Sequence, residues 1–537
     1  MRPSTSPDVL VVGGGLAGLV TALEALRGGL SVAVLDRDAA TRSGGLARWA
    51  FGGMALVGTP LQARMGIPDH PDLALADWRR FGALDPADPW SEAWARHYVE
   101  RSRPEVHDWL LGEGLRFLPA VNWVERGRFG DGNSVPRYHV LWGTALRLVE
   151  RLLAALEQAG RDGRLAWLHR HRVVALERTH GRVDGVVAVD EARGREVRLR
   201  GGAVVLAMGG LNGSLEECRR NWPADRPRPT TMLNGAHPFA DGRLHRHVVE
   251  SLGGVLVNPG AMWHYAAGIP HPFPHFEGHG LSLIPCKSAL WLDHRGHRIG
   301  PEPLVTGFDT RWLCDRVAAQ ARPWTWQLLN RRIAARELAV SGAEHNPRIR
   351  DRQGLRFLLD TVFGSDRLLR QLQAESPEVL VDAKLDGLAT KMNALTCGHD
   401  VDPEVLKASV AAFDAAFAAP AVGHNDPQLR LIQHARQWRP DRLRTCAPAP
   451  LQKPGAGPFV AIRLQLVTRK SLGGLRTDLG SRVLDASGAP LPGLYAVGEA
   501  AGFGGGGSHG QRSLEGTFLP GCILTARAAA RSLRGGG

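Results

Sequence analysis

The hydrophobic pattern of the first 36 residues predicts a strand, a tight turn, a helix and a second strand. Apolar residues are nearly continuous over 8–12 (DVLVV), and the glycine-rich turn GGGLAG follows at once. The next stretch, TALEALRGG, has helical apolar spacing, and LSVAVLD is a second apolar run that ends in an acid. Short apolar runs bounded by glycine are typical of buried strands, whereas apolar residues three and four apart indicate a helix.

Further along, the pattern predicts a helix and a β-meander, followed by a segment of different character. An amphipathic helix is expected between about 140 and 160, and three or four β-rich runs joined by glycine turns are expected in 170–210. Between about 233 and 451, Pro, His and Trp accumulate and strand alternation is rare, while 366–373 and 402–418 have helical spacing. This middle segment is predicted to be an inserted domain.

Strand signals return near the C-terminus, in FVAIRLQLV and GLYAVGE, before a final helix in GTFLPGCILTARAAARSL. A chain of 537 residues is too long for a single hydrophobic core. We therefore expect an α/β protein with a first domain at 1–232, a cap or substrate domain at 233–451, and a return to the first domain at 452–537.

Composition excludes several classes of protein. No run reaches the roughly 18 apolar residues of a spanning helix, and the N-terminal apolar run enters a glycine turn rather than a signal-peptide cleavage site. The six cysteines are far apart, with no CxxC pair and no Cys/His spacing suited to zinc. We expect free thiols in a reducing cytoplasm, no membrane segment and no metal site.

The net charge of +13 could suggest a nucleic-acid partner. The basic residues are mostly Arg, however, and they are scattered among Ala, Gly and Leu without a dense tail or a basic and aromatic stripe. No nucleic-acid partner is therefore expected, although the positive field would favour anionic substrates.

The glycine turn has the spacing of a dinucleotide-binding motif. Gly13 permits a tight turn, Gly15 lets a pyrophosphate approach the backbone, and Gly18 lets the helix pack closely on the strand. Asp36, at the end of the second strand, is placed to accept hydrogen bonds from an adenosine ribose. The alternative, in a chain with 65 glycines, is a purely structural turn.

Two distant segments favour FAD over NAD. The segments 203–210 (AVVLAMGG) and 493–502 (GLYAVGEAAG) are apolar strands that stop at glycines, which suits a dinucleotide longer than one βαβ unit can hold. Glu499 can hydrogen-bond ribityl hydroxyls. The helix that starts near Gly516 can direct its positive end at the pyrimidine edge of an isoalloxazine.

Five segments occur in an order typical of one superfamily: VVGGGLAGL with Asp36, SGGLARWAFGGM at 43–54, AMGG at 207–210, SLGGLRTD at 471–478, and GLYAVGEAAGFGGGGSHGQRSLEGTFLPG at 493–521. The chain resembles the group of fumarate reductase and succinate dehydrogenase flavoproteins and 3-ketosteroid Δ1-dehydrogenases, and most closely the branch called FAD-binding dehydrogenases. The resemblance implies a Rossmann-type, glutathione-reductase-like FAD-binding domain with a β-meander, plus an inserted α+β cap domain.

The same resemblance implies that residues 43–45, 52 and 53 line the flavin and that Val173 contacts the adenine through its backbone. No His lies in 43–48, where covalently flavinylated relatives attach the cofactor, so non-covalent FAD is implied. The residues expected to contact FAD are Gly13, Gly15, Leu16, Ala17, Gly18, Asp36, Arg37, Ser43, Gly44, Gly45, Gly52, Gly53, Val173, Ala207, Gly209, Gly498, Glu499, Gly516, Thr517 and Phe518.

Four residues near the C-terminus are candidates for holding the substrate. Arg512 matches the arginine of the NRLGG segment of fumarate reductases, where an Arg fork holds a carboxylate; the alternative is an ordinary surface Arg. His509, in the same loop, is a hydrogen-bonding or a structural histidine. Arg469 and Lys470 precede SLGG, where fumarate reductases carry a histidine pair, and a cation there can polarise a carbonyl or carboxylate.

Tyr138 and Tyr265 are candidates for proton transfer opposite the flavin. They lie in VPRYHVLWG and AMWHYAAG, and the chain holds only four Tyr. The alternative is that these rings pack one domain against the other, which is also the expected role of Trp263.

The resemblance is incomplete on the substrate side. Val460 occupies a position that is tyrosine in ketosteroid Δ1-dehydrogenases, and the fumarate reductase histidine pair is absent, so neither parent chemistry transfers intact. We expect hydride transfer between flavin N5 and a carbon next to a carbonyl or carboxylate, in either direction. A flavin oxidase and a non-catalytic FAD protein are the alternatives, and no residue identifies the electron donor or acceptor.

Overall fold

The computed structural model describes residues 6–418, 425–502, 512 and 514–535. The chain divides into two compact units. Unit 1 comprises Met1–Pro223, Ala236–Trp263 and Arg469–Gly537, and unit 2 comprises Ala224–Gly235 and His264–Thr468.

These units differ from the boundaries expected at 233 and 451. The segment 236–263 belongs to unit 1, where its helix α8 (Arg243–Leu252) buries Leu244 and Val248 in the same apolar cluster as strand residues of that unit. The segment 452–468 belongs to unit 2. The role of unit 2 as a cap stays a prediction.

The first apolar run is the centre of the main sheet of unit 1, whose strand order among the described residues is β21-β22-β10-β1-β2-β6. β1 pairs in parallel with β10 and β2, which pair in parallel with β22 and β6, while β21 is an antiparallel edge strand. Strands β1 and β10 are buried at every residue, as is typical of parallel strands covered on both faces. The bounds are β1 Val9–Val12, β2 Val32–Asp36, β6 Leu165–His169, β10 Ala203–Leu206, β21 Arg482–Leu484 and β22 Pro490–Ala496.

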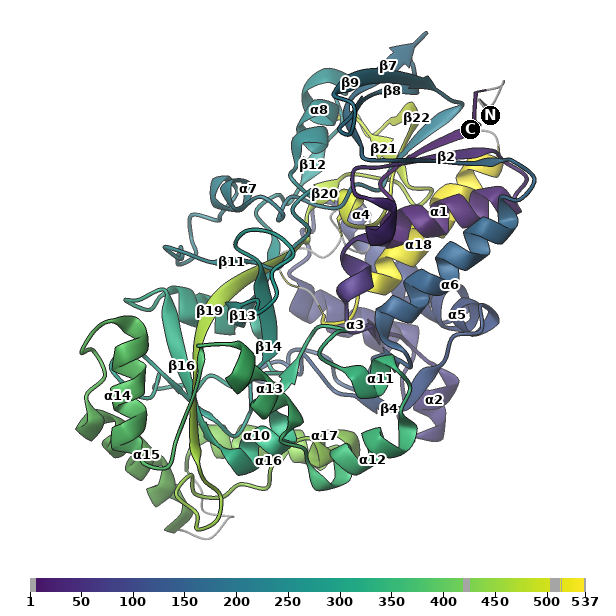
Figure 1. Ribbon diagram of the computed structural model, residues 1–537. Helices are drawn as coiled ribbons and strands as arrows, with labels where there is room; N and C mark the ends of the chain where they lie inside the picture. Colours follow the sequence, from purple (N-terminus) through teal and green to yellow (C-terminus); the bar gives the residue numbers. More distant parts are fainter. Residues whose placement is uncertain (1–5, 419–424, 503–511, 513, 536–537) are drawn as a thin grey trace. The chain divides into compact units, whose positions relative to one another are not determined.

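Three of the expected helices pack together in unit 1 (Figure 1). α1 (Leu16–Arg27) lies between α6 (Thr144–Ala159) and α18 (Phe518–Arg534), which come from distant parts of the sequence. Their apolar residues belong to one buried cluster that includes Val9 and Val205 of the sheet. This packing holds the N-terminal glycine turn and the C-terminal segment in one unit.

A three-stranded antiparallel sheet, β7-β8-β9, follows β6 in the sequence, and a second one has the order β3-β5-β4. The remaining elements of unit 1 lie outside the main sheet and the three-helix cluster. Their bounds are β3 Gly53–Ala55, α2 Pro60–Arg64, α3 Pro71–Gly82, α4 Pro89–Arg101, α5 Asp108–Gly112, β4 Phe117–Asn122, β5 Tyr138–Leu141, β7 His171–Thr179, β8 Arg182–Asp190, β9 Arg195–Arg200, α7 Leu215–Arg220, β12 Leu256–Val257 and β20 Gly474–Leu475.

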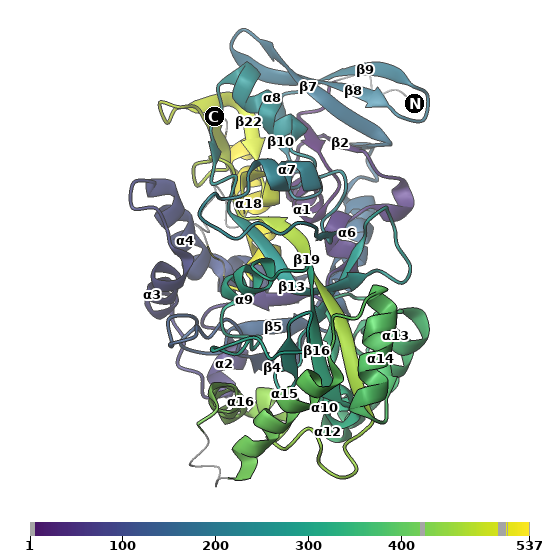
Figure 2. The same ribbon diagram turned by 90° about the vertical axis from the view of Figure 1, so that its left-hand side faces the viewer.

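Unit 2 is organised around a sheet with the order β15-β16-β19-β13-β14-β17, and β11 and β18 also pair with β19 (Figure 2). The rarity of strand alternation in 233–451 therefore does not mean that strands are rare there. These strands give no alternating signal because they are buried: β16 (Trp324–Asn330) is buried at six of its seven residues. The other strands are β11 Leu233–Asn234, β13 Met262–Pro270, β14 Gly280–Ile284, β15 Leu290–Leu292, β17 Ala339–Val340, β18 Val379–Asp382 and β19 Phe459–Ser471.

The helices expected at 366–373 and 402–418 are present as α13 (Arg367–Glu375) and α15 (Pro403–Ala415). α13 and α14 (Leu385–Thr396) both contact β18 of the sheet. The other helices of unit 2 are α9 Thr310–Ala318, α10 Arg331–Glu337, α11 Pro347–Arg350, α12 Gly354–Phe363, α16 Pro427–Gln437 and α17 Arg439–Leu443.

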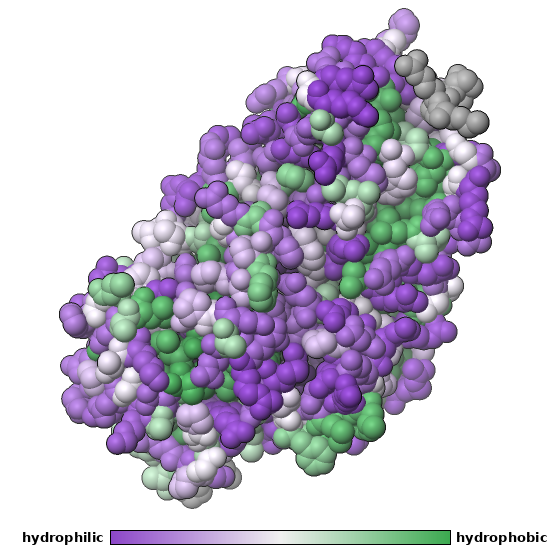
Figure 3. Space-filling view, viewed as in Figure 1, coloured by the Kyte–Doolittle hydropathy of each residue, from purple (hydrophilic) through white to green (hydrophobic). Residues whose placement is uncertain are grey.

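The face of the molecule seen in Figure 3 is mostly hydrophilic, with an apolar patch at its lower edge over α12. Helix α12 has no buried residue, and Leu355 and Phe363 are among its exposed apolar side chains. Among the described residues, no helix is both long enough and apolar enough to cross a membrane.

Candidate active site

The glycines of the first turn are required by close packing, except for Gly15. Gly13 has φ +108°, and a Cβ there would lie 2.4 Å from the carbonyl oxygen of Ala207. A Cβ at Gly18 would lie 1.9 Å from the oxygen of Gly13, so this glycine allows α1 to pack on β1. A Cβ at Gly15 would meet nothing within 4 Å. Open space in front of Gly15 is what a dinucleotide phosphate needs in order to reach the helix N-terminus.

Asp36 is fixed at the end of β2 beside this turn. Its two carboxylate oxygens accept backbone N–H groups from Gly14 and Asp38, each at 2.9 Å. Burial raises the pKa of Asp36 above its ordinary value. Arg37, the next residue, contacts other side chains: its guanidinium lies 4.2 Å from the ring centroid of Phe239 and donates to Glu191 at 3.2 Å.

The segment 43–53 packs against the glycine turn. The N–H of Gly44 donates to the oxygen of Gly14 at 2.9 Å, and a Cβ at Gly45 would lie 3.2 Å from the Cα of Gly15. Gly52 has φ +94°, and a Cβ there would lie 2.8 Å from the backbone nitrogen of Ala145. The turn and the segment 43–53 therefore lie together.

The C-terminal strand brings Gly498 and Glu499 to the same region of unit 1. A Cβ at Gly498 would lie 2.7 Å from the Cβ of Ala17, at the start of α1. Glu499 accepts the N–H of Ser471 at 2.8 Å, and burial raises the pKa of Glu499 to about 7. The Oγ of Ser471 also accepts the N–H of Leu211 at 2.7 Å. Segments from the beginning, middle and end of the chain therefore converge.

A second cluster surrounds Lys470. Its ammonium lies 3.9 Å from the ring centroid of Phe518, and burial lowers the pKa of Lys470 to about 8. The indole N–H of Trp263 donates to Glu515 at 3.1 Å, and the ring of Trp263 meets that of Phe518 edge to face at 5.7 Å. The negative charge of Glu515 acts on Lys470. This cluster combines a cation, an acid and apolar walls.

Tyr138 belongs to the same neighbourhood. A Cβ at Gly53 would lie 1.8 Å from its hydroxyl oxygen, and a Cβ at Gly516 would lie 2.8 Å from its ring. The phenol is thus held between two glycines that are expected to line the flavin. Burial, reinforced by the charge of Glu515, raises the pKa of Tyr138 far above its ordinary value, so the phenol stays protonated at neutral pH.

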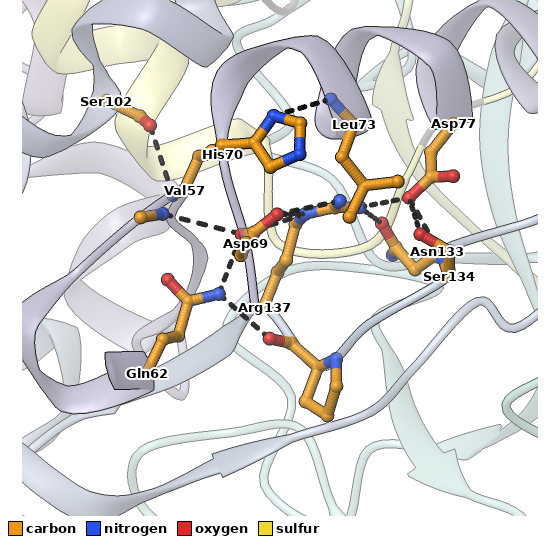
Figure 4. Close-up of polar contacts among 12 residues, drawn as sticks. Val57, Gln62, Asp69, His70, Leu73, Asp77, Ser102, Asn133, Ser134 and Arg137 are labelled. Atoms are coloured by element: carbon orange, nitrogen blue, oxygen red, sulfur yellow. Dashed lines mark hydrogen bonds and ion pairs between the residues drawn. The ribbon is translucent and has the colours of Figure 1, made fainter. Parts of the chain in front are cut away.

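The residue before Tyr138 anchors this strand through a buried ionic network (Figure 4). Arg137 is only 3% exposed and bonds Asp69 through Nε and Nη2, at 3.0 and 2.9 Å. Its Nη1 donates to Asp77 at 2.5 Å and to Asn133 at 2.7 Å. Such a network fixes the backbone at 137 and therefore positions the tyrosine that follows.

Other predicted residues lie elsewhere or outside the described part of the chain. Arg512 lies against the end of α3: its N–H donates to Gly82 at 3.2 Å and its guanidinium lies 5.3 Å from the ring centroid of Phe81. His509 is outside the described residues. Tyr265 belongs to β13 in unit 2, and Val173 lies in β7 opposite Ala188. The functional roles of these four residues stay predictions.

Glu515 is the clearest residue that the sequence analysis missed. It precedes Gly516 directly, in the segment that carries the family resemblance, and that position was its only signal. Ser471 and Asn212 were also missed. Asn212 is fully buried and donates to the oxygen of Lys470 at 2.8 Å, so it fixes the backbone of the cation.

The residues of unit 1 fit the chemistry of an adenine-flavin dinucleotide. A glycine with open space stands at the N-terminus of α1, Asp36 ends the second strand, and Glu499 presents a half-buried carboxyl shortly after another strand. These are the donors and acceptors that a pyrophosphate and polyol hydroxyls require.

Comparison with known proteins agrees with this fit. The model of the FAD binding domain family matches residues 8–519. A KsdD-like steroid dehydrogenase of Mycobacterium tuberculosis (strain H37Rv) is 41% identical, with 98% of this chain and 95% of that protein covered. A KsdD-like steroid dehydrogenase of Mycolicibacterium smegmatis is also 41% identical, over 95% of this chain and 96% of that protein.

Two solved structures share the fold. The 3-ketosteroid Δ1-dehydrogenase of Sterolibacterium denitrificans, in complex with 1,4-androstadiene-3,17-dione, gives a TM-score of 0.70 at 17% identity, with 99% of this chain and 100% of that chain covered. A flavocytochrome c3 fumarate reductase in its open conformation gives a TM-score of 0.69 at 19% identity, with 99% of this chain and 79% of that chain covered. The mixed α/β fold of these flavoproteins is therefore the fold of this chain.

Proposed function

The chain belongs to the FAD binding domain family and is an FAD-dependent oxidoreductase acting on CH–CH groups, and we propose that its substrate is a ketone of the steroid class. The observation that carries the substrate class is the 41% identity to KsdD-like steroid dehydrogenases over almost the whole of both chains. The dehydrogenated or reduced bond lies next to the carbonyl, because a carbonyl acidifies the adjacent C–H and stabilises the charge that develops.

We propose that unit 1 is a Rossmann-type, glutathione-reductase-like FAD-binding domain and that unit 2 is an inserted α+β cap. The parallel strand order β22-β10-β1-β2-β6 and the antiparallel β7-β8-β9 sheet support the first part. In this arrangement Gly15 would let the pyrophosphate approach the backbone, and Asp36 would accept hydrogen bonds from the adenosine ribose. Glu499 would hydrogen-bond ribityl hydroxyls, and the N-terminal end of α18 would stabilise negative charge on the flavin ring.

Bound FAD supplies hydride transfer at N5. Lys470 and the side chains around it stabilise the negative charge that develops on the substrate and transfer the accompanying proton. The ammonium of Lys470 stabilises negative charge on the carbonyl oxygen, as a preorganised cation in a dry site does. Phe518 and Trp263, which are 4% and 2% exposed, exclude water from one side of it. Because its pKa is about 8, Lys470 is mostly cationic at neutral pH.

Tyr138 is our candidate for the proton transfer that accompanies hydride movement. Its phenol is held between Gly53 and Gly516, and its raised pKa keeps it protonated, so it can donate a proton in the direction of reduction. Val460, the departure from the ketosteroid Δ1-dehydrogenase pattern, is fully buried in β19 between Leu329 and Val381. Lys470 takes over the carbonyl-polarising role that a tyrosine at that position would have.

We propose non-covalent attachment of FAD and a cytoplasmic location. The absence of histidine from 43–48 supports the first. The second rests on the six cysteines, which are all in the described part of the chain and form no disulfide.

An anaerobic titration of the flavin tests the substrate class. The FAD-loaded protein is mixed with saturated 3-ketosteroids, with simple cyclic ketones and with short dicarboxylates, and the visible absorbance of the flavin is followed. Bleaching by a steroid ketone, with an unsaturated steroid as product, is expected. Bleaching by dicarboxylates alone, or by none of the three sets, contradicts the proposal. Rapid recolouring in air would identify the oxidase alternative.

A further inference from the structure

Four histidines and a glutamate gather in unit 2, outside the residues proposed for redox chemistry. His271 follows β13, and His275 and His279 lie in the loop that leads to β14. Glu344 and His345 follow β17, which pairs with β14. The sheet register therefore brings two segments 73 residues apart to one place.

The carboxylate of Glu344 is the centre of this cluster. Its Oε1 lies 2.7 Å from Nε2 of His271 and 3.6 Å from Nε2 of His345, and its Oε2 lies 3.8 Å from Nε2 of His275. Ligand atoms of His271, Glu344 and His345 all lie within 4.8 Å of one another. A tetrahedral ion with bonds of 2.0–2.1 Å separates its ligand atoms by about 3.3 Å. The observed separations lie on either side of this value.

Without a bound cation, the buried side chain of His345 lowers the stability of the folded protein. The residue is 3% exposed, and within the described residues neither of its ring nitrogens has a hydrogen-bond partner. Its Nε2 lies 3.6 Å from Oε1 of Glu344, which is beyond hydrogen-bonding distance. A buried polar group that lacks a hydrogen bond destabilises a fold, and a bound ion would remove that cost by coordinating the ring nitrogen.

Ring geometry selects the ligand set. His271 and His279 also belong to a second candidate group, with His275, but their rings are stacked at 4.3 Å with planes only 7° apart. Nitrogen lone pairs of parallel stacked rings do not converge on one ion. His279 instead supports the loop, because its Nδ1 accepts the N–H of His275 at 3.3 Å.

We propose that His271, His345, Glu344 and His275 bind one divalent transition-metal ion, with Zn²⁺ as the first candidate. Imidazole nitrogens with one carboxylate suit zinc and its neighbours rather than Mg²⁺ or Ca²⁺, which prefer oxygen ligands. Glu344 is 40% exposed on its side chain, which leaves a path for the ion to enter. The ion ties the loop 271–279 to the segment after β17.

Binding requires one proton rearrangement at His271. The N–H of Phe273 donates to Nδ1 of His271 at 3.0 Å, so the imidazole proton is on Nε2, facing Glu344. Coordination through Nε2 moves that proton to Nδ1, so the hydrogen bond from Phe273 is exchanged for a metal bond.

The test is zinc binding to the FAD-loaded protein, with no substrate present. Wild type, Glu344→Gln and His345→Gln are stripped with a chelator and titrated with ZnCl₂ by calorimetry, and the metal content is measured after desalting. His297→Gln is the matched control, since His297 is 57% exposed and pairs only with Asp293 among the contacts described for it. We expect one zinc per chain in wild type and control, and binding weakened at least about ten-fold in both test variants.

A cobalt spectrum keeps the proposal falsifiable if a variant fails to fold, which flavin absorbance and circular dichroism would reveal. Co²⁺ added to the stripped wild type should give the intense visible bands of a tetrahedral site. Absence of stoichiometric zinc from wild type, absence of these bands, or equal affinity in His345→Gln overturns the proposal. The readout is metal content, so its failure is independent of the redox function.

Discussion

The Oε1 atom of Glu499 accepts a hydrogen bond from the backbone N–H of Ser471 at 2.8 Å. Ser471 in turn accepts the N–H of Leu211 through its Oγ, at 2.7 Å. One carboxyl group thus joins the residues after β22 to the end of β19 and, through Ser471, to the residues after β10. The ionisation of this carboxyl is a sensitive probe of the site.

Replacing Glu499 by Gln should change how stability depends on pH. Burial raises the pKa of Glu499 to about 7, so the folded protein keeps this proton while the unfolded chain, with a pKa near 4.3, releases it. Wild-type stability therefore falls as pH rises from about 4.3 to 7, by about 3 kcal/mol from this group. Glu499→Gln has no such titrating group at this position. In the FAD-free proteins, the melting temperature of Glu499→Gln relative to that of wild type should therefore rise as the pH increases from about 4.3 to 7. Parallel pH curves would contradict the burial argument.

Lys470 should impose an alkaline limit on activity. Burial lowers the pKa of Lys470 to about 8, and the proposed role needs the cation, so kcat/KM should decline as pH rises through about 8. Lys470→Arg stays charged above about pH 8, so its kcat/KM should not show this alkaline decline. Lys470→Met has no charge and should lower kcat/KM by about 10²–10³. A pH profile of the steroid reaction measures this. An unchanged alkaline limb in Lys470→Arg would remove Lys470 from the mechanism.

Loss of the Tyr138 hydroxyl should slow turnover without releasing the flavin. Tyr138→Phe keeps the ring between Gly53 and Gly516, so the FAD content should match wild type. A proton-transfer group contributes about 10²–10⁴ to the rate, and kcat should fall by that amount. The measurement is the rate of flavin reduction or reoxidation by steroid in a stopped-flow instrument. A decrease of less than about ten-fold would show that another residue transfers the proton.

Arg137 should be a strong stability residue. Asp69 and Asp77 have fully buried side chains, and Arg137→Leu removes the buried cation that pairs with both of them. Breaking a buried pair in this way costs about 3–5 kcal/mol, measured by urea unfolding. Arg79→Leu is the control, because its partner Glu92 and Arg79 itself are exposed, and it should cost less than about 1 kcal/mol. Equal costs would show that the network contributes nothing special.

Local sequence patterns predicted the elements that form the proposed cofactor site. β1, α1, β2, α6 and α18 occur where apolar spacing and glycine turns predict them, because each buries an apolar face or run in one unit. In unit 2, β19 follows the strand signal in FVAIRLQLV, but the strands within 233–451 were not predictable in the same way. Buried strands such as β16 have no alternating pattern that separates them from other apolar segments.

The side-chain clusters depended on contacts between distant residues. The pairing of Trp263 with Glu515 joins positions 252 residues apart, and that of His271 with Glu344 joins positions 73 apart. No local spacing signals either pair. The expectation of no metal site considered Cys and His spacings along the chain, whereas the proposed ligands meet only through the pairing of β14 with β17.

The most direct test of FAD binding by unit 1 is the FAD content of wild type, Gly15→Val and Gly18→Val. Nothing lies within 4 Å of a Cβ at Gly15, so Gly15→Val should fold normally but fill the space that the pyrophosphate needs. Gly18→Val should disturb folding, since its Cβ would lie 1.9 Å from the oxygen of Gly13. We predict a yellow wild type with one acid-extractable FAD per chain, and a folded Gly15→Val with at least about ten-fold weaker FAD binding. A colourless wild type that does not take up FAD, or full FAD occupancy in Gly15→Val, would contradict this prediction.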